Sequence, residues 1–307
     1  MYIKSEIIDW LLKGDICIQY QVHRDLFCED KYNIEKLQSK IHEKGWGFFL
    51  LSKRDPKTKM WGNGLYSPKW VSTHYTLLEL KNMGINPTHP AYNESALLLL
   101  NNLWFNKGKV SKNKFQDMCV AAMILSITTY SKIKSEKIYE IIDYIIENNL
   151  PDGGWNCSWE RGSKISSVHT TLSVLEAIRD YLNNNYEYRI HELKIKKKEA
   201  EELLLKRKIF KKLSDDEPIK LEFTRFPYPS RWKYNFLRAL DYFQSVDKKY
   251  DKRMDDSINL LLKKRNKDGT WNNYAMIPGD VHFIPEEPGN PSRMNTLKAL
   301  RVLEKYK

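Results

Sequence analysis

Apolar residues recur along the chain with helical spacing, and one short pattern appears five times. The fourth and seventh places of each copy are apolar, which puts them on the same face of a helix. Ser72, Ser167 and Ser292 precede three of the copies and can cap a helix start. We therefore predict five helices that begin at equivalent points. The copies are HYTLLEL at His74, HTTLSVL at His169, YNFLRAL at Tyr234, MNTLKAL at Met294 and CVAAMIL at Cys119.

A turn pattern of Asp, Gly and Trp precedes three of these helices. A glycine after aspartate permits a turn with positive φ, and the tryptophan can fill the space between successive helical units. The order along the chain is then outer helix, turn, irregular loop and inner helix. The three copies are Asp55 with Trp61-Gly62, Asp152-Gly153-Gly154-Trp155 and Asp268-Gly269-Thr270-Trp271.

These units predict an all-α protein with one repetitive domain. We expect residues 1–43 to form N-terminal helices that pack on a repeat domain of residues 44–307. Residues 186–226 lengthen one interval and contain a charged helix near Ile190–Leu213, which we place on the solvent side as an insertion. The helices could form an open solenoid or a closed ring. In a ring, the starts of the inner helices converge at one end, which we call the mouth.

Composition limits the classes of function. Lys, Glu or Asn interrupts the longest apolar segments, so we expect no transmembrane helix. The N-terminal segment carries Glu6 and Asp9 and reads as an amphipathic helix, not a signal peptide. The cysteines are scattered, which indicates reduced thiols in a cytoplasmic protein. They are Cys17, Cys28, Cys119 and Cys157.

A net charge of +12 favours anionic partners. The excess is mostly lysine and is dispersed, and no nucleic-acid motif is present, so we expect no nucleic-acid partner. Peripheral contact with an acidic membrane surface stays open. The sequence gives no indication of a partner subunit.

The DGGW and DGTW turns, each leading to an H-T-T-L or N-T-L helix, resemble the terpenoid cyclase/protein prenyltransferase superfamily over roughly residues 40–307. The resemblance is to a bacterial branch described as squalene-cyclase-like or prenyltransferase-like. It implies an α/α toroid of about five to six helical hairpins, with the active site at the mouth and a hydrophobic, isoprenoid-like substrate. The D-x-D-D acid of squalene–hopene cyclases is absent, and Asp215-Asp216-Glu217 and Asp255-Asp256 lie away from the inner-helix starts.

The same resemblance implies a zinc site. Protein prenyltransferase β subunits hold zinc through Asp-x-Cys at one inner-helix start and His at a later one, and Asp117, Cys119 and His169 match that pattern. Lys114 stands where that family places a lysine near the prenyl diphosphate. Cys157 adds a thiol, and zinc favours thiolate, imidazole and carboxylate ligands.

The aromatic residues that flank the family's zinc ligands are replaced by Val120 and Val168. A cysteine at a helix start is also often a small buried group. A metal-free pair of Cys119 and His169 is a further alternative.

Other candidate residues lie at the expected mouth. His74 shares the frame of His169 and could transfer a proton or only hold structure, while Arg231 and Arg293 could bind a phosphate or carboxylate or neighbouring loop groups. His282 lies on a Pro- and Gly-rich loop that could cover the mouth. We predict as catalytic His74, Tyr234 and His282, and as substrate-binding Trp70, Lys114, Trp159, Arg231, Trp232 and Arg293.

Three functions follow. The first is an enzyme acting on a hydrophobic substrate, with a diphosphate or carboxylate group bound by the basic residues and with zinc assisting. The second is a non-catalytic toroid that binds a hydrophobic ligand. The third is carbohydrate processing, which needs paired carboxylates facing a cavity, and Asp152 and Glu160 are the suggestive pair.

Overall fold

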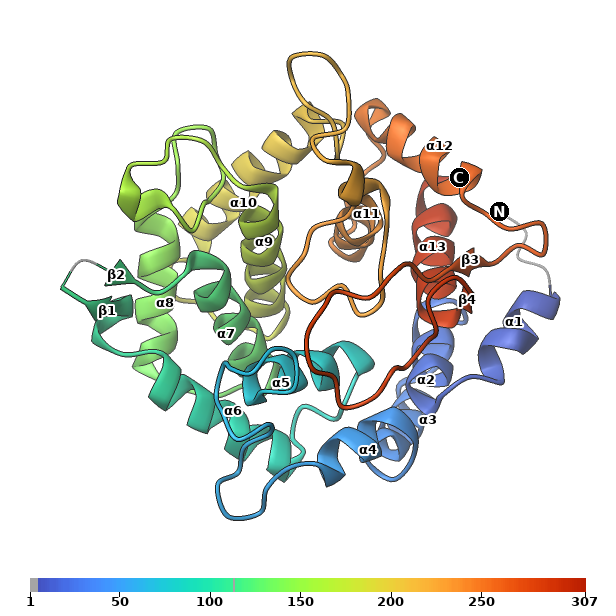
Figure 1. The fold of residues 1–307 in the computed structure, drawn as a ribbon, viewed down its shortest axis with the longest axis horizontal. Coiled ribbons are helices and arrows are strands. Elements are labelled where there is room, and N and C mark those ends of the chain that lie inside the picture. Colours follow the sequence, from blue (N-terminus) through green and yellow to red (C-terminus); the bar gives the residue numbers. More distant parts are fainter. Residues whose placement is uncertain (1–4, 113) are drawn as a thin grey trace.

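The computed structural model describes residues 5–112 and 114–307, and these residues are mostly helical. The all-α prediction is confirmed. Figure 1 shows an inner row of helices with the other helices outside it. The inner row is α2 (Ile16–Asp25), α5 (Thr73–Met83), α7 (Met118–Tyr130), α9 (Val168–Asn183), α11 (Phe236–Ser245) and α13 (Arg293–Tyr306). The others are α1 (Ser5–Leu12), α3 (Lys31–Ser39), α4 (Gly45–Ser52), α6 (Pro90–Leu103), α8 (Glu136–Glu147), α10 (Ile190–Lys206) and α12 (Asp255–Lys263).

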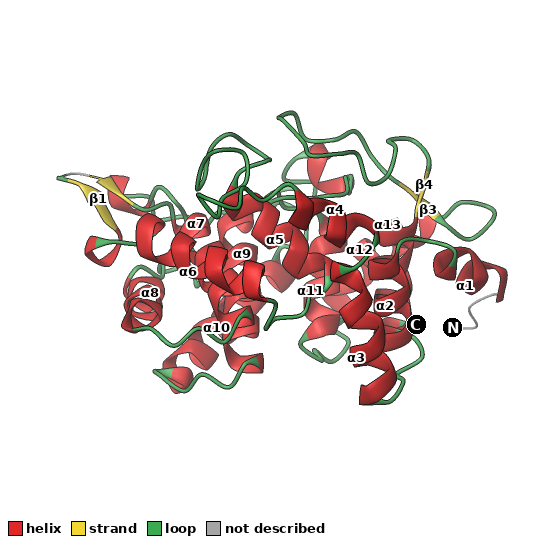
Figure 2. Ribbon diagram, turned by 90° about the horizontal axis from the view of Figure 1, so that it is seen from below, coloured by secondary structure: helices red, strands yellow, loops and turns green. Residues whose placement is uncertain are grey.

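Two short antiparallel strand pairs lie among the loops. They are β1 (Lys109–Ser111) with β2 (Lys114–Phe115), and β3 (Trp271–Asn272) with β4 (Pro291–Ser292). In the side view of Figure 2 both pairs and the longest loops lie toward the same side of the molecule. That side is the mouth, because the inner helices begin there.

The inner helices follow one another until the last meets the first. α5 contacts α7, α7 contacts α9, α11 contacts α13, and α13 contacts α2. Side chains complete the circuit: Gln21 Nε2 in α2 donates to the Asn82 carbonyl in α5 at 3.2 Å. Arg238 Nε in α11 donates to Glu176 Oε1 in α9 at 2.9 Å. Residues from all parts of the described chain therefore face one another across the middle (Figure 1).

The three turn tryptophans make the same two hydrogen bonds. Each is fully buried. Each indole N–H donates, at 2.6–2.8 Å, to a carbonyl in the preceding helix, namely that of Leu50, Ile145 or Leu261. Each backbone N–H donates, at 3.0–3.1 Å, to a threonine hydroxyl of the following inner helix, namely that of Thr73, Thr171 or Thr296. A buried tryptophan therefore links the two helices of each of these units through groups that would otherwise lack partners.

The predicted helix starts agree closely with the structure. α5, α7, α9 and α13 begin within one residue of the predicted points, and α11 begins at Phe236, two residues after Tyr234. The Ser292 side chain caps α13 by accepting from the Asn295 N–H at 2.9 Å. Ser72 and Ser167 occupy N-cap positions but their side chains make no capping hydrogen bond.

The charged helix is shorter than predicted. α10 ends at Lys206 and not at Leu213, because Lys208 and Ile209 have positive φ values of 42° and 73°. α10 lies outside α9 and packs against it. Its charges pair along its own surface, for example Lys197 with Glu201 at 2.5 Å.

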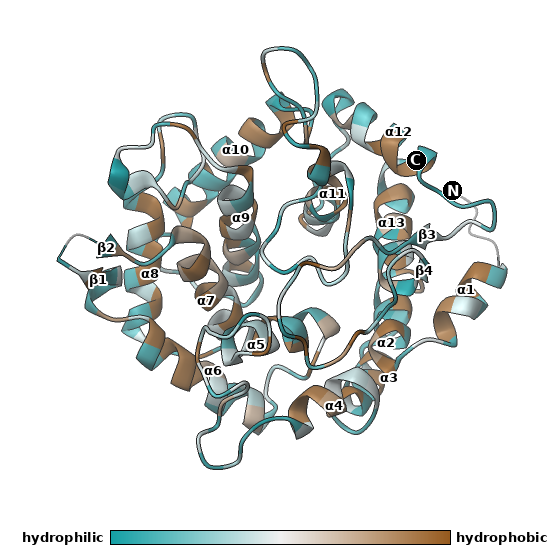
Figure 3. Ribbon diagram, in the orientation of Figure 1, coloured by the Kyte–Doolittle hydropathy of each residue, from teal (hydrophilic) through white to brown (hydrophobic). Residues whose placement is uncertain are grey.

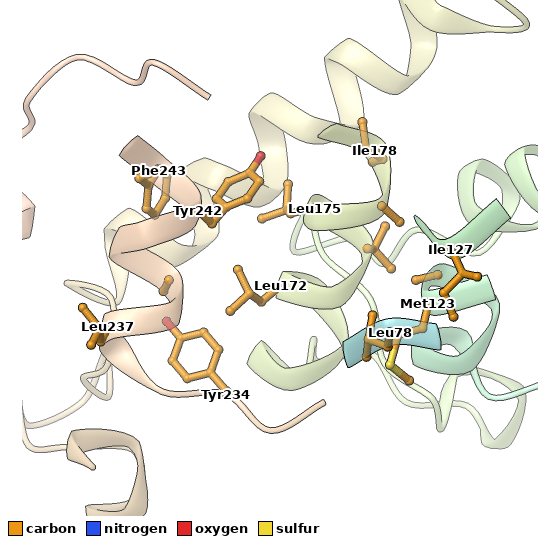
Figure 4. Packing of buried hydrophobic residues seen from close by; sticks show 14 of the residues in the cluster. Leu78, Met123, Ile127, Leu172, Leu175, Ile178, Tyr234, Leu237, Tyr242 and Phe243 are labelled. Carbon is orange, nitrogen blue, oxygen red and sulfur yellow. The ribbon is translucent and has the colours of Figure 1, made fainter. Parts of the chain in front are cut away.

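The core lies between the inner helices and their neighbours. Figure 4 shows Leu172 and Leu175 of α9 packed toward α11 on one side, with α7 on the other. α7 is almost entirely buried and mostly hydrophobic in Figure 3. Within the described residues, no helix combines the length and hydrophobicity needed to cross a membrane.

Candidate functional site

A cavity of about 820 Å³ lies in the middle of the inner row. Side chains from all six inner helices line it, together with the loop at residues 228–231. This volume falls within the range of small-molecule binding sites, and such sites often lie between packed helices. We call it the central cavity.

The two ends of the central cavity differ in character. Its wall near the helix starts carries the large side chains of Tyr75, Leu78, Met123, Tyr228 and Met294, together with the ion pair of Arg231 and Glu79. Its wall near the helix ends is charged, and Glu304 and Lys305 at that end are exposed. The whole lining contains eight basic and six acidic side chains. They are Arg24, Lys81, Arg179, Arg231, Arg238, Lys298, Arg301 and Lys305, and Asp25, Glu79, Glu176, Asp180, Asp241 and Glu304.

Asp180 is the most strongly bound of these carboxylates. It pairs with Lys81 Nζ at 2.7 Å and Arg179 Nη2 at 2.9 Å, and the Ser126 hydroxyl donates to it at 2.5 Å. Burial alone would raise the pKa of Asp180, but Arg179 and Lys81 lower it to about 2. The carboxyl is therefore ionised at neutral pH.

Three further carboxylates are held by arginines. Arg301 bridges Asp25 at 2.5 Å and Asp241 at 3.1 Å. Burial raises the pKa of Asp25, and the positive charge of Arg301 brings it below its usual value. For Glu176 burial is likewise opposed by Arg238, and the net pKa is lowered. Asp25 and Glu176 are therefore acceptors and counter-ions, not proton donors.

Lys298 differs from the other basic residues of the wall. It has no ion pair or hydrogen bond with the residues that the structure describes, and its ammonium lies 5.5 Å from the centre of the Tyr228 ring. Burial lowers the pKa of Lys298. The negative charge of Asp241 raises this pKa, and the positive charges of Arg301 and Arg238 lower it further. Lys298 is therefore a basic side chain of the wall that makes no ion pair with the described residues.

His74 is buried at the start of α5. Its side chain is fully buried, and neither ring nitrogen has a hydrogen-bond partner among the described residues. The rings of Tyr66 and Tyr75 pack edge-on against it at 5.3 and 5.0 Å. Burial, with a smaller effect of the Lys69 charge, lowers its pKa to about 3. His74 is thus a neutral, packed imidazole that does not line the central cavity.

His169 and Tyr234, at the starts of successive inner helices, contact each other. The Tyr234 N–H donates to His169 Nδ1 at 2.8 Å, and the Tyr234 hydroxyl donates to the Ile209 carbonyl. Burial, and then the positive charge of Arg238, lowers the pKa of His169 to about 4. Neither residue lines the central cavity.

The four predicted zinc ligands do not form one group. Cys119 Sγ and Cys157 Sγ lie 3.4 Å apart, but Asp117 is exposed and His169 Nδ1 accepts the Tyr234 N–H. The described residues contain no cluster of three or more His, Cys, Asp or Glu that could hold a metal. A catalytic zinc needs three protein ligands. We derive no chemistry through zinc, and its binding stays a prediction.

The Cys119–Cys157 contact is asymmetric. The Cys119 backbone nitrogen and Thr170 Oγ1 each lie 3.5 Å from Cys157 Sγ. The hydrogen bond with Cys119 lowers the pKa of Cys157 to about 7 against the opposing effect of burial. The same contact raises the pKa of Cys119.

Loops cover the mouth. The loop between β3 and β4 crosses the space between the inner helices in Figure 1. Trp70 Nε1 donates to the Pro278 carbonyl in this loop at 2.8 Å, and His282 Nε2 lies 2.9 Å from Thr76 Oγ1 of α5. His282 and Trp70 therefore attach this loop to the start of α5.

Arg231 is the one predicted site residue on the wall of the central cavity. Its side chain is buried, pairs with Glu79 and lies 5.6 Å from the centre of the Trp70 ring. Burial lowers its pKa to about 10. Trp232 beside it is half-buried, and its indole N–H has no partner among the described residues.

The predicted substrate-binding residues Lys114, Trp159 and Arg293 do not line the central cavity. Lys114 is exposed on β2. Trp159 Nε1 donates to the Tyr144 hydroxyl at 3.1 Å. Arg293 Nε donates to the Trp10 carbonyl at 3.0 Å, and its guanidinium stacks on the Trp10 ring, because α1 packs beside the start of α13. These contacts hold loops and helices together.

The wall residues missed by sequence reasoning share a position in the aligned pattern. Counted from the first residue of each copy, the fifth and eighth places face the cavity, one helical stripe away from the apolar fourth and seventh. The sequence feature that could have located this wall is the set of residues next to the repeated apolar positions, and not the residues at the helix starts. The eighth places are Lys81, Ser126, Glu176, Asp241 and Arg301, and the fifth are Leu78, Met123, Ser173, Arg238 and Lys298.

Comparison with known proteins gives little further information. No family model matches the chain, and no curated protein matches it. The solved structure of the apo type II terpene cyclase MstE from Scytonema is similar over 94% of this chain and 88% of that chain, with 17% identity and a TM-score of 0.46. A likeness at that level carries no argument about activity, so the side chains of this chain must supply it.

Proposed function

We propose that the chain is an α/α toroid whose central cavity binds an amphiphilic anion, with an apolar, isoprenoid-like chain and a phosphate, diphosphate or carboxylate head. The apolar chain would lie against Tyr75, Met123 and Met294 near the helix starts. The head group would lie beside Lys298 and Arg238, in the first halves of α13 and α11. Closure of the inner row through Arg301 and Asp25, which joins α13 to α2, supports the toroid.

Lys298 is the observation that carries this proposal. On the wall of the central cavity, Lys81, Arg238 and Arg301 each form an ion pair with a carboxylate. Lys298 forms no ion pair with the described residues. A ligand with a negative head would provide the charge that Lys298 lacks and would receive donors from Arg301 and Arg238 beside it.

The cavity supports binding better than squalene-cyclase chemistry. Protonation of an alkene requires a carboxylic acid in its protonated form, but the pKa values of Asp25, Glu176 and Asp180 are all lowered. We therefore propose ligand binding and assign no reaction to these carboxylates.

Carbohydrate processing is not favoured by the contacts of its candidate pair. Asp152 accepts from the N–H and the hydroxyl of Ser166, which holds the turn before α9. Glu160 accepts from the Phe115 N–H at 2.7 Å. Neither carboxylate lines the central cavity.

Isothermal titration with three probes tests the proposal: geranyl diphosphate, geraniol and inorganic diphosphate. We expect geranyl diphosphate to bind more tightly than either part alone. Lys298→Gln should weaken its binding by about tenfold or more, because a hydrogen bond to a charged group contributes about 1.5–3 kcal/mol. Lys263→Gln, on the exposed end of α12, should leave binding unchanged. Equal binding of geraniol and geranyl diphosphate would contradict an anion site.

A further inference from the structure

Two cysteines meet at the start of α7. Cys119 lies in the first turn of that helix, and Cys157 lies in the loop between Trp155 and α9. Their Sγ atoms are 3.4 Å apart although the residues are 38 positions apart in sequence. Both are free thiols and only partly buried. The fold, and not the local chain, therefore creates this pair.

The surroundings position one sulfur for attack. The Cys119 N–H and the Thr170 hydroxyl both lie 3.5 Å from Cys157 Sγ. These donors can stabilise negative charge on that sulfur. A disulfide bond is about 2.05 Å long, so the two sulfurs need to approach by roughly 1.4 Å, which rotation of partly exposed side chains can supply.

Neither cysteine serves the proposed ligand site. Both are absent from the wall of the central cavity. The described residues also offer no third ligand that would make the pair a metal site. Two adjacent thiols that are accessible to solvent have one other common chemistry, which is exchange with disulfides.

We propose that Cys119 and Cys157 form a thiol–disulfide exchange site for low-molecular-weight disulfides. Cys157 Sγ attacks one sulfur of the small disulfide; its S–S bond breaks, one small thiolate leaves, and Cys157 carries a mixed disulfide. Cys119 Sγ then attacks Cys157 Sγ and releases the second small thiolate. Each leaving thiolate takes up the proton that a cysteine lost. The two protein thiols are oxidised to one disulfide, and the small disulfide is reduced to two thiols.

Peptide mapping by mass spectrometry tests this on the full chain equilibrated in buffers of reduced and oxidised glutathione. We expect a linked Cys119–Cys157 peptide that disappears when reduced glutathione is in excess. Cys119→Ser should stop the reaction at one glutathione on residue 157, because the resolving thiol is missing. Cys28→Ser is the matched control. Cys28 is an exposed free thiol outside the Cys119–Cys157 pair, so its replacement should not change the Cys119–Cys157 linkage.

The results that would overturn the proposal are distinct. Glutathione on Cys28 alone, with no linked peptide in the wild-type chain, would show that the pair does not exchange. Zinc bound by the purified chain and released on alkylation of Cys119 and Cys157 would show that the thiols serve a metal instead. Neither result depends on what occupies the central cavity, so the ligand proposal is tested separately.

Discussion

At the scale of single residues, His74 at the start of α5 is packed among aromatic rings. His74 was a candidate catalyst from its frame, but it is fully buried and has no hydrogen-bond partner among the described residues. Sequence spacing could place it at the start of α5. Spacing could not show that Tyr66 and Tyr75 would enclose the ring, because those contacts depend on how the preceding loop folds back.

His74 should make the protein sensitive to mild acid. Its folded pKa of about 3 lies below its usual value, so the unfolded chain takes up a proton first as pH falls, and stability is lost from about pH 6.5 downward. His74→Leu should reduce the slope of unfolding free energy against pH by up to about 1.4 kcal/mol per pH unit. Urea unfolding at pH 7.5, 6 and 5 measures this; identical slopes in both proteins would contradict it.

Asp180 should be needed for stability. It is 7% exposed and pairs with Lys81 and Arg179, so Asp180→Asn removes the carboxylate of both ion pairs and leaves the Lys81 ammonium, whose side chain is 8% exposed, without its partner. We expect a loss of about 3–5 kcal/mol in unfolding free energy. Asp215→Asn changes an exposed carboxylate that pairs with Lys212 and accepts from the Glu217 N–H, and it should change stability by less than about 1 kcal/mol. Comparable losses in the two variants would refute a special role for Asp180.

At the scale of elements, the helices were predictable and their ends less so. The spacing of leucines located the starts of α5, α7, α9 and α13, because burying one face of a helix fixes its pattern. The end of α10 could not be read from the same pattern. Its charged sequence continues beyond Lys206, and the positive φ values at Lys208 and Ile209 that end it are set by packing.

The hydrogen bond between a turn tryptophan and a threonine should stabilise its helix pair. Thr171→Val keeps the shape of the side chain but leaves the buried Trp155 N–H without an acceptor. We expect it to cost about 1–3 kcal/mol in unfolding free energy. Thr171→Ser retains the hydroxyl and should cost less, as chemical denaturation can measure. A serine variant less stable than the valine variant would show that the methyl group matters more than the bond.

At the scale of the molecule, sequence reasoning predicted the class of fold and a site at the mouth, whereas the observed cavity lies deeper, between the inner helices. The aligned helix starts suggested a site at the mouth. The loop from β3 to β4 covers that end, while side chains one or two turns further along line the central cavity. Which stripe of each helix faces inward follows from the packing of whole helices, so single positions in the sequence could not reveal it.

The structure of the chain in complex with geranyl diphosphate would test the central claim most directly. We expect the diphosphate within hydrogen-bonding distance of Lys298 Nζ, with Arg238 or Arg301 beside it, and the hydrocarbon chain against Tyr75 and Met123. A ligand bound instead at the mouth beside His74 and Cys119, or no ligand in the central cavity at saturating concentration, would contradict the account.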